Sequence, residues 1–169
     1  MLDFMGMALD QQTDPTSIIL RLHPDPETRN RQLSNLAYSH HNYLRITRML
    51  RSLVELGQPD FVPSFLLFIA AQQAMGVLNN WSLKDSMDRF WVYCMRDQDA
   101  QHAVVRAVKW VRGNGDFPMA MYRRVVEEWK TTGKWKFDEK ELGLKKIQRS
   151  ILDRVLTRRP RRSFEESER

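Results

Sequence analysis

The chain has 169 residues, 42% of them hydrophobic and 28% charged, so it is long enough for one domain with a sizeable core. A single cysteine, Cys94, excludes an intrachain disulfide and a multi-cysteine zinc site. The whole positive excess behind the net charge of +6 lies in residues 101–169, which hold 18 basic and 10 acidic residues. This asymmetry indicates an acidic partner: a nucleic acid, an anionic membrane surface or an acidic protein.

The first residues do not resemble a signal peptide. Residues 1–14 carry aspartates and no lysine or arginine, so the basic n-region is missing, and we expect a flexible N-terminus there. The longest apolar run, residues 61–71, contains Pro63 and is shorter than the ~20 residues that a membrane span needs. We therefore expect an intracellular protein without a membrane span, in the cytoplasm, the nucleus or both.

Helix signals dominate the next part of the chain. Residues 17–22 (SIILRL) are predicted to be helical or extended, because a lone strand has no partner. Asp25-Pro26-Glu27 is typical of a helix start, and apolar residues recur at helical spacing up to Gly57, which predicts one long helix. A second helix, over residues 63–78, is apolar nearly all round and is predicted to be the central element.

Four more helices follow in the prediction. They start near Ser82, Ala103, Pro118 and Asp138. Residues 82–85 resemble a capping box, and Gly133 ends the fifth helix. The predicted fold class is an all-α, single-domain bundle of five to six helices over residues 15–156. A disordered basic and acidic tail is predicted over residues 157–169, because no apolar pattern there offsets the cost of ordering the chain.

Few residues offer chemistry. A nucleophile needs a nearby base, and His102 follows Cys94, but Cys94 falls on an apolar face and is predicted to be buried and inert. Asp97, Asp99 and His102 could ligate a metal, yet no second cluster completes a site, and capping of a helix explains the same residues. We therefore expect no catalytic residue, no metal site, no cofactor and no enzyme activity.

The C-terminal half interleaves cationic and aromatic side chains, a mixture that suits single-stranded nucleic acid. Trp135 lies between two lysines, where it either stacks on a base or fills the core from a loop. The candidate nucleic-acid contacts are Arg106, Lys109, Arg112, Arg123, Arg124, Lys134, Trp135, Lys136, Lys145, Lys146, Arg149, Arg158, Arg159, Arg161 and Arg162.

These residues lead to two functional hypotheses. The first is a small, non-catalytic protein that binds RNA or single-stranded DNA, mainly through phosphate contacts of its C-terminal half. The alternative is a self-associating assembly or adaptor protein, matrix- or nucleocapsid-like, whose nine methionines suit an adaptable interface. Lys145-Lys146 and the RRPRR run have the spacing of a bipartite nuclear localisation signal, which adds an import receptor to the expected partners.

Overall fold

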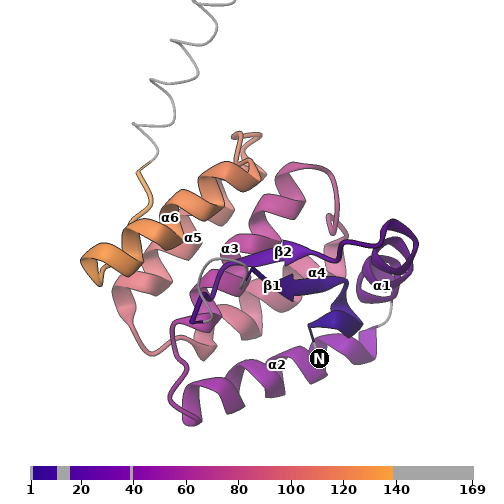
Figure 1. The fold of residues 1–169 in the computed structure, drawn as a ribbon, viewed down its shortest axis with the longest axis horizontal. Helices are drawn as coiled ribbons and strands as arrows, with labels where there is room; N and C mark the ends of the chain where they lie inside the picture. The colour runs from indigo at the N-terminus through magenta and orange to yellow at the C-terminus, as the bar shows by residue number, and fades with distance from the viewer. Residues whose placement is uncertain (1, 11–15, 39, 139–169) are drawn as a thin grey trace, which may run out of the picture. The chain divides into compact units, whose positions relative to one another are not determined.

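A computed structural model describes residues 2–10, 16–38 and 40–138. Six α-helices lie in these ranges: α1 (Pro26–Tyr38), α2 (His40–Glu55), α3 (Phe61–Ala74), α4 (Trp81–Ser86), α5 (Gln98–Arg112) and α6 (Met119–Thr132). Smaller elements are the 3-10 turns η1 (Asp3–Met5) and η3 (Val92–Cys94), the π-helical turn η2 (Met87–Trp91), and the strands β1 (Met7–Leu9) and β2 (Leu20–Leu22). The predicted all-α class is confirmed, with one small sheet added (Figure 1).

Helix α3 is the centre of the core, because every residue from Phe61 to Gln73 is buried. Helices α2, α5 and α6 pack against it. Large aromatic side chains fill the space beside it. The ring of Phe65 lies 6.2 Å from that of Trp91, and the ring of Phe68 lies 5.6 Å from that of Tyr122. The apolar sequence of α3 had predicted this central position.

The long helix predicted up to Gly57 is two helices, α1 and α2. At this break, polar side chains donate hydrogen bonds to backbone carbonyls near the end of α1. The Tyr43 hydroxyl and the Asn80 amide donate to the Ala37 carbonyl at 2.8 and 2.9 Å, and the Asn42 amide donates to the Asn35 carbonyl at 3.2 Å. These contacts satisfy carbonyls that a continuous helix would bond internally.

The strands β1 and β2 pair in antiparallel register, with Ala8 opposite Arg21. The sequence predicted a flexible N-terminus and a helical or extended SIILRL segment. The structure places Asp3–Met5 in η1 and Met7–Leu9 in β1, and the extended alternative holds for Leu20–Leu22, whose missing partner is β1. Burial drives the pairing, because Met7 and Leu20 are fully buried on one face of the hairpin.

Caps place the later helices. The Asn80 side chain accepts the N–H of Leu83 at 2.8 Å, so Asn80 and not Ser82 caps α4. Gly133 ends α6 with a φ of 66°, a left-handed conformation that favours glycine. The predicted sixth helix and the predicted tail lie outside the described residues.

Candidate functional site

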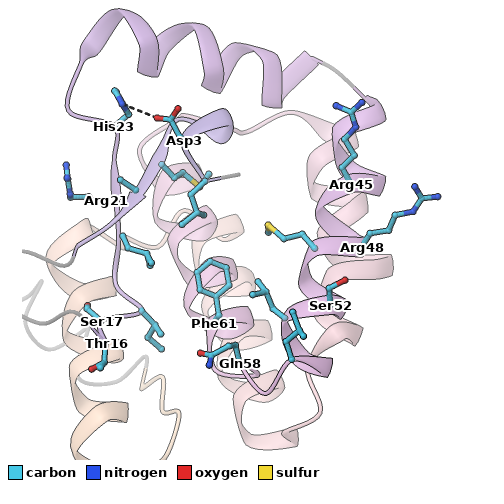
Figure 2. A pocket seen from close by; sticks show the side chains of 18 of the residues that line it. Asp3, Thr16, Ser17, Arg21, His23, Arg45, Arg48, Ser52, Gln58 and Phe61 are labelled. Carbon is cyan, nitrogen blue, oxygen red and sulfur yellow. Dashed lines mark ion pairs between the residues drawn. The ribbon is translucent and has the colours of Figure 1, made fainter.

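A pocket of about 1340 Å³ opens between the β1–β2 hairpin and α2, beside the start of α3 (Figure 2). The hairpin supplies one wall and α2 supplies the facing wall. Phe61, at the first turn of α3, stands between them. A pocket of this size is large enough for a peptide segment or a drug-sized ligand.

The interior of the pocket is mostly apolar. Its apolar lining residues are Leu2, Met7, Ala8, Leu9, Ile18, Pro24, Met49, Leu53, Leu56 and Phe61. Met49 and Leu53 are half-buried and Leu56 is 76% exposed, so apolar surface stays accessible along α2. Accessible apolar surface in a concave site is typical of a binding site.

The rim of the pocket is cationic. Arg45 and Arg48 stand on the α2 wall and Arg21 stands on the hairpin wall, with the side chains of Arg48 and Arg21 directed outward from the space between the walls (Figure 2). Among the described lining residues, Asp3 is the only acid. The Nε of Arg21 is buried and has no hydrogen-bond partner among the described residues. The rim therefore favours a ligand with negative charge.

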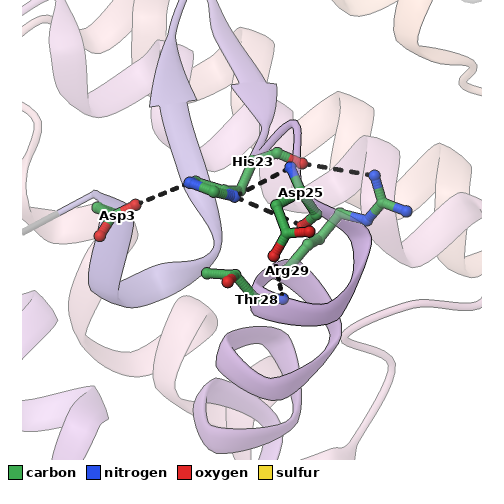
Figure 3. Close-up of polar contacts among 5 residues, drawn as sticks. All are labelled: Asp3, His23, Asp25, Thr28 and Arg29. Carbon is green, nitrogen blue, oxygen red and sulfur yellow. Dashed lines mark hydrogen bonds and ion pairs between the residues drawn. The ribbon is translucent and has the colours of Figure 1, made fainter.

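Polar contacts hold the hairpin wall in place (Figure 3). His23 Nε2 lies 3.1 Å from Asp3 Oδ1, and His23 Nδ1 accepts the N–H of Asp25 at 3.2 Å. A neutral ring with its proton on Nε2 satisfies both contacts. Arg29 donates to the His23 carbonyl at 3.4 Å, which ties β2 to α1.

Asp25 completes this junction by capping α1. Its carboxylate accepts the N–H of Thr28 at 2.8 Å. The hydrogen bond from the Thr28 side chain, followed by that from the Thr28 backbone, lowers the pKa of the Asp25 carboxyl below its usual 3.8. The helix cap and the pocket wall therefore share one short polar network.

The residues weighed for catalysis have structural roles. Cys94 is buried, and burial raises the pKa of its thiol above the ordinary 9.0, which disfavours the thiolate. Asp97 caps α5 by accepting the N–H of Asp99 at 2.9 Å, as the capping interpretation expected. His102 is exposed on α5, and no group of three metal-ligating side chains occurs in the described part of the chain.

The predicted nucleic-acid contacts are spread over several elements, and about half of them lie outside the described residues. Seven of the cations are described, and they stand on α5, on α6 and in the segment after α6: Arg106, Lys109, Arg112, Arg123, Arg124, Lys134 and Lys136. Arg112 pairs with Asp88, and Arg123 pairs with Asp10. Lys145, Lys146, Arg149, Arg158, Arg159, Arg161 and Arg162 lie outside the described residues.

Trp135 is not placed to stack on a base. Its side chain is only 4% exposed, and its ring lies flat against Trp129, with 5.0 Å between centroids and 14° between planes. Its indole N–H donates to Asp60 at 3.3 Å. This burial agrees with the alternative that Trp135 fills the core from a loop and leaves little of the ring accessible to a base.

The pocket residues were missed in the sequence. Arg21, Arg45 and Arg48 lie in residues 1–50, where five arginines balance five acids, so no charge signal marks them. The one available signal was local: Arg45, Met49 and Ser52 share a helix face that the buried stripe of α2 leaves open.

The fold and the site together define a small helical domain with an accessible, cation-rimmed apolar pocket. Comparison with known proteins gives its family. Residues 1–125, about three-quarters of the chain, match the family described as the opioid growth factor receptor (OGFr) conserved region, and the chain belongs to that family. No solved structure matches the chain.

Named relatives agree. The chain is 34% identical over 107 residues to opioid growth factor receptor-like protein 1 of Xenopus tropicalis, covering 63% of this chain and 19% of that protein. It is also 34% identical over 106 residues to the proteins of that name from Mus musculus and Rattus norvegicus, covering 63% of this chain and 21% of each. The chain thus spans about a fifth of the length of these relatives.

These matches correct the predicted function. Because the chain belongs to a family named for a receptor, both functional hypotheses are wrong. These were a protein that binds RNA or single-stranded DNA, and a matrix- or nucleocapsid-like assembly protein. The predicted partners, which were nucleic acid, a second copy of the chain and an import receptor, are corrected with it. The charge excess that suggested them is partly neutralised by the ion pairs of Arg112 and Arg123. Within the described ranges, no helix combines the length and apolar character needed to cross a bilayer.

Proposed function

We propose that this chain is a non-catalytic binding domain that holds a peptide segment of another protein in the pocket between the hairpin and α2. The observation that carries the proposal is the pocket itself, with apolar side chains inside and arginines at its rim. Apolar surface supplies affinity on burial, and the surrounding charges select the partner.

The name of the relatives supports a binding role. They are called receptor-like proteins, and a receptor acts by binding a ligand. The non-catalytic part of the proposal is supported by the roles of the candidate groups, since Cys94 is buried and Asp97 caps a helix. An exposed nucleophile beside a base would have pointed the other way.

A blocking substitution tests the proposal. Random linear heptapeptides displayed on phage are selected against the full chain, and the dissociation constants of the enriched peptides are measured by fluorescence anisotropy. Ser52→Trp places a large ring in the pocket from an exposed position on α2. We expect it to weaken binding by about tenfold or more, because one excluded anchor side chain removes ~1.5–3 kcal/mol.

Glu55→Trp is the matched control, because Glu55 is exposed on the same helix but does not line the pocket. It should bind the peptides as the unmodified chain does. The proposal fails if selection enriches no peptide, or if the enriched peptides bind the Ser52→Trp chain with unchanged affinity.

A further inference from the structure

We propose that the peptide is an extended, acidic segment that pairs with the open edge of β1 as a third strand of the sheet. This inference rests on the proposed function and adds the chemical class of the partner and its mode of binding. It follows from three features: the open backbone groups on the outer edge of β1, the position of β1 beside the pocket, and the charge of the rim.

The register decides which backbone groups point outward. The Asp10 N–H donates to the Ile19 carbonyl at 2.7 Å, and the His23 N–H donates to the Gly6 carbonyl at 2.9 Å. Inward and outward groups alternate along an antiparallel strand. The even-numbered residues of β1 therefore face β2, whereas Met7 and Leu9 direct their N–H and C=O groups to the outer edge.

Hydroxyl groups from the core cover the start of the outer edge of β2. The Leu20 N–H donates to the Tyr122 hydroxyl at 2.7 Å. Just before the strand, the Ile18 carbonyl accepts the Ser64 hydroxyl at 2.6 Å. Hydroxyl groups of α3 and α6 thus cover the start of this edge, whereas the Leu20 carbonyl and the backbone groups of Leu22 have no hydrogen-bond partner among the described residues.

The outer edge of β1 is open. The Met7 N–H donates to the Leu2 carbonyl at 3.1 Å, but the Met7 carbonyl and both backbone groups of Leu9 have no hydrogen-bond partner in the described part of the chain. Figures 1 and 2 both show β1 lying between β2 and α2, so this edge faces the pocket. Met7, Ala8 and Leu9 all belong to the pocket lining. An open edge beside an apolar pocket is the arrangement used for strand addition.

The lining selects the side chains of the added strand. Alternate side chains of an extended peptide point to opposite faces. Apolar side chains on one face can rest against Met49, Leu53 and Phe61, which line the pocket. Arg45 and Arg48 stand at the rim, and the only acid in the described lining, Asp3, already contacts His23. Acidic residues in the peptide complement this charge.

Charge reversal tests the chemistry. Heptapeptides selected against the full chain should be enriched in aspartate and glutamate, and selection against the Arg45→Glu/Arg48→Glu chain should remove that enrichment or favour lysine and arginine. Arg31→Glu/Arg51→Glu is the control, because both positions are exposed and neither lines the pocket. It should leave the acidic enrichment in place. Enrichment without acidic residues, or acidic enrichment that survives reversal at the rim, overturns the charge argument.

The open edge is tested through Leu9. Leu9→Pro removes the outward N–H without touching the bonds between the strands, and Leu9→Ala removes side-chain area while keeping the N–H. We expect Leu9→Pro to weaken binding of the best acidic peptide by about fivefold to tenfold more than Leu9→Ala does. This difference in affinity corresponds to about one backbone hydrogen bond. Equal weakening by the two variants contradicts strand addition.

Methylation of the peptide backbone gives a second measurement that does not depend on the folding of a variant. N-methylation at successive positions should weaken binding to the unmodified chain at every second residue, and the Leu9 amide should exchange more slowly with solvent in the complex. A flat methylation profile, or a Leu9 amide with unchanged exchange, overturns the inference. The proposed function survives that result if Ser52→Trp still weakens peptide binding by about tenfold or more, so the two failures are distinguishable.

Discussion

The hydroxyl of Tyr122 on α6 lies 2.9 Å from the hydroxyl of Ser64 on α3, inside the core. Ser64 donates to the Ile18 carbonyl, so Tyr122 donates to Ser64 and accepts the Leu20 N–H at 2.7 Å. A continuous series of hydrogen bonds thus joins α3 and α6 to the Ile18 carbonyl, just before β2, and to the Leu20 N–H, at the start of β2. Each of the two hydroxyl groups donates once and accepts once, so both of these buried hydroxyls are satisfied.

Tyr122→Phe breaks this series of hydrogen bonds at its centre. The buried Leu20 N–H loses its acceptor, and we expect the free energy of unfolding to fall by about 1–3 kcal/mol. Urea denaturation followed by circular dichroism measures the change. Tyr93→Phe is the control, because Tyr93 is 72% exposed, and it should leave the midpoint unchanged. Equal midpoints for Tyr122→Phe and the unmodified chain would show that the network contributes nothing to stability.

The same phenol predicts a fall in stability at alkaline pH. Burial, the largest cause, raises the pKa of Tyr122 from 10.0 to about 12. Above pH 10 the unfolded chain releases this proton while the folded chain retains it, so ionisation favours unfolding. The contribution of the protonated Tyr122 phenol to the free energy of unfolding is fully present below pH 10 and is lost as the pH rises through 12. The loss approaches roughly 2–3 kcal/mol for a shift of this size.

The difference between the unmodified chain and Tyr122→Phe isolates this contribution, because all other tyrosines, including Tyr43, are present in both. Denaturation curves recorded from pH 8 to pH 11 should converge as the pH rises. A constant difference across that range would contradict an elevated pKa.

Trp135 is expected to matter for stability. Its ring is buried against Trp129, so Trp135→Ala should lower the free energy of unfolding by about 3–5 kcal/mol, the cost of deleting a large buried aromatic side chain. Lys134→Ala and Lys136→Ala flank it at exposed positions and should change stability by less than about 0.5 kcal/mol. A Trp135→Ala chain as stable as these controls would place the ring outside the core.

Much of the helical fold could be predicted from local sequence. The apolar stretch of α3 predicts its burial, and Gly133 predicts the end of α6, because both signals act within one element. The break between α1 and α2 could not be predicted. It is accompanied by contacts of Tyr43 and Asn80 with the Ala37 carbonyl, and Asn80 lies 43 residues away along the chain.

The candidate site was harder to predict for a similar reason. Strands of three residues, such as β1, are too short to show a period of two, and their pairing depends on burial of Met7 and Leu20 in the folded core. The rim arginines are far apart in the sequence and come together only because the folded hairpin and α2 face each other across the pocket. The charge excess in residues 101–169 is visible in the sequence, but it led to a predicted nucleic-acid surface in the C-terminal half and not to this pocket.

Gly115 and Trp110 carry a final prediction. The Gly115 N–H donates to the Trp110 carbonyl at 2.8 Å, and the Trp110 indole N–H donates to the Asp116 carbonyl at 3.1 Å, so the indole lies over the glycine. A Cβ at position 115 would overlap the indole ring. Gly115→Ala should therefore lower the free energy of unfolding by about 1–3 kcal/mol, the usual cost of overpacking.

Gly113→Ala is the matched control in the same turn, because its nearest neighbour would be the Lys109 carbonyl at an ordinary 3.4 Å. It should leave the urea midpoint close to that of the unmodified chain. Replacing Trp110 with leucine should remove most of the penalty of Gly115→Ala, since the clash requires the ring, and a double-mutant cycle measures this coupling. Additive effects of the two substitutions would show that the ring does not set the requirement for glycine.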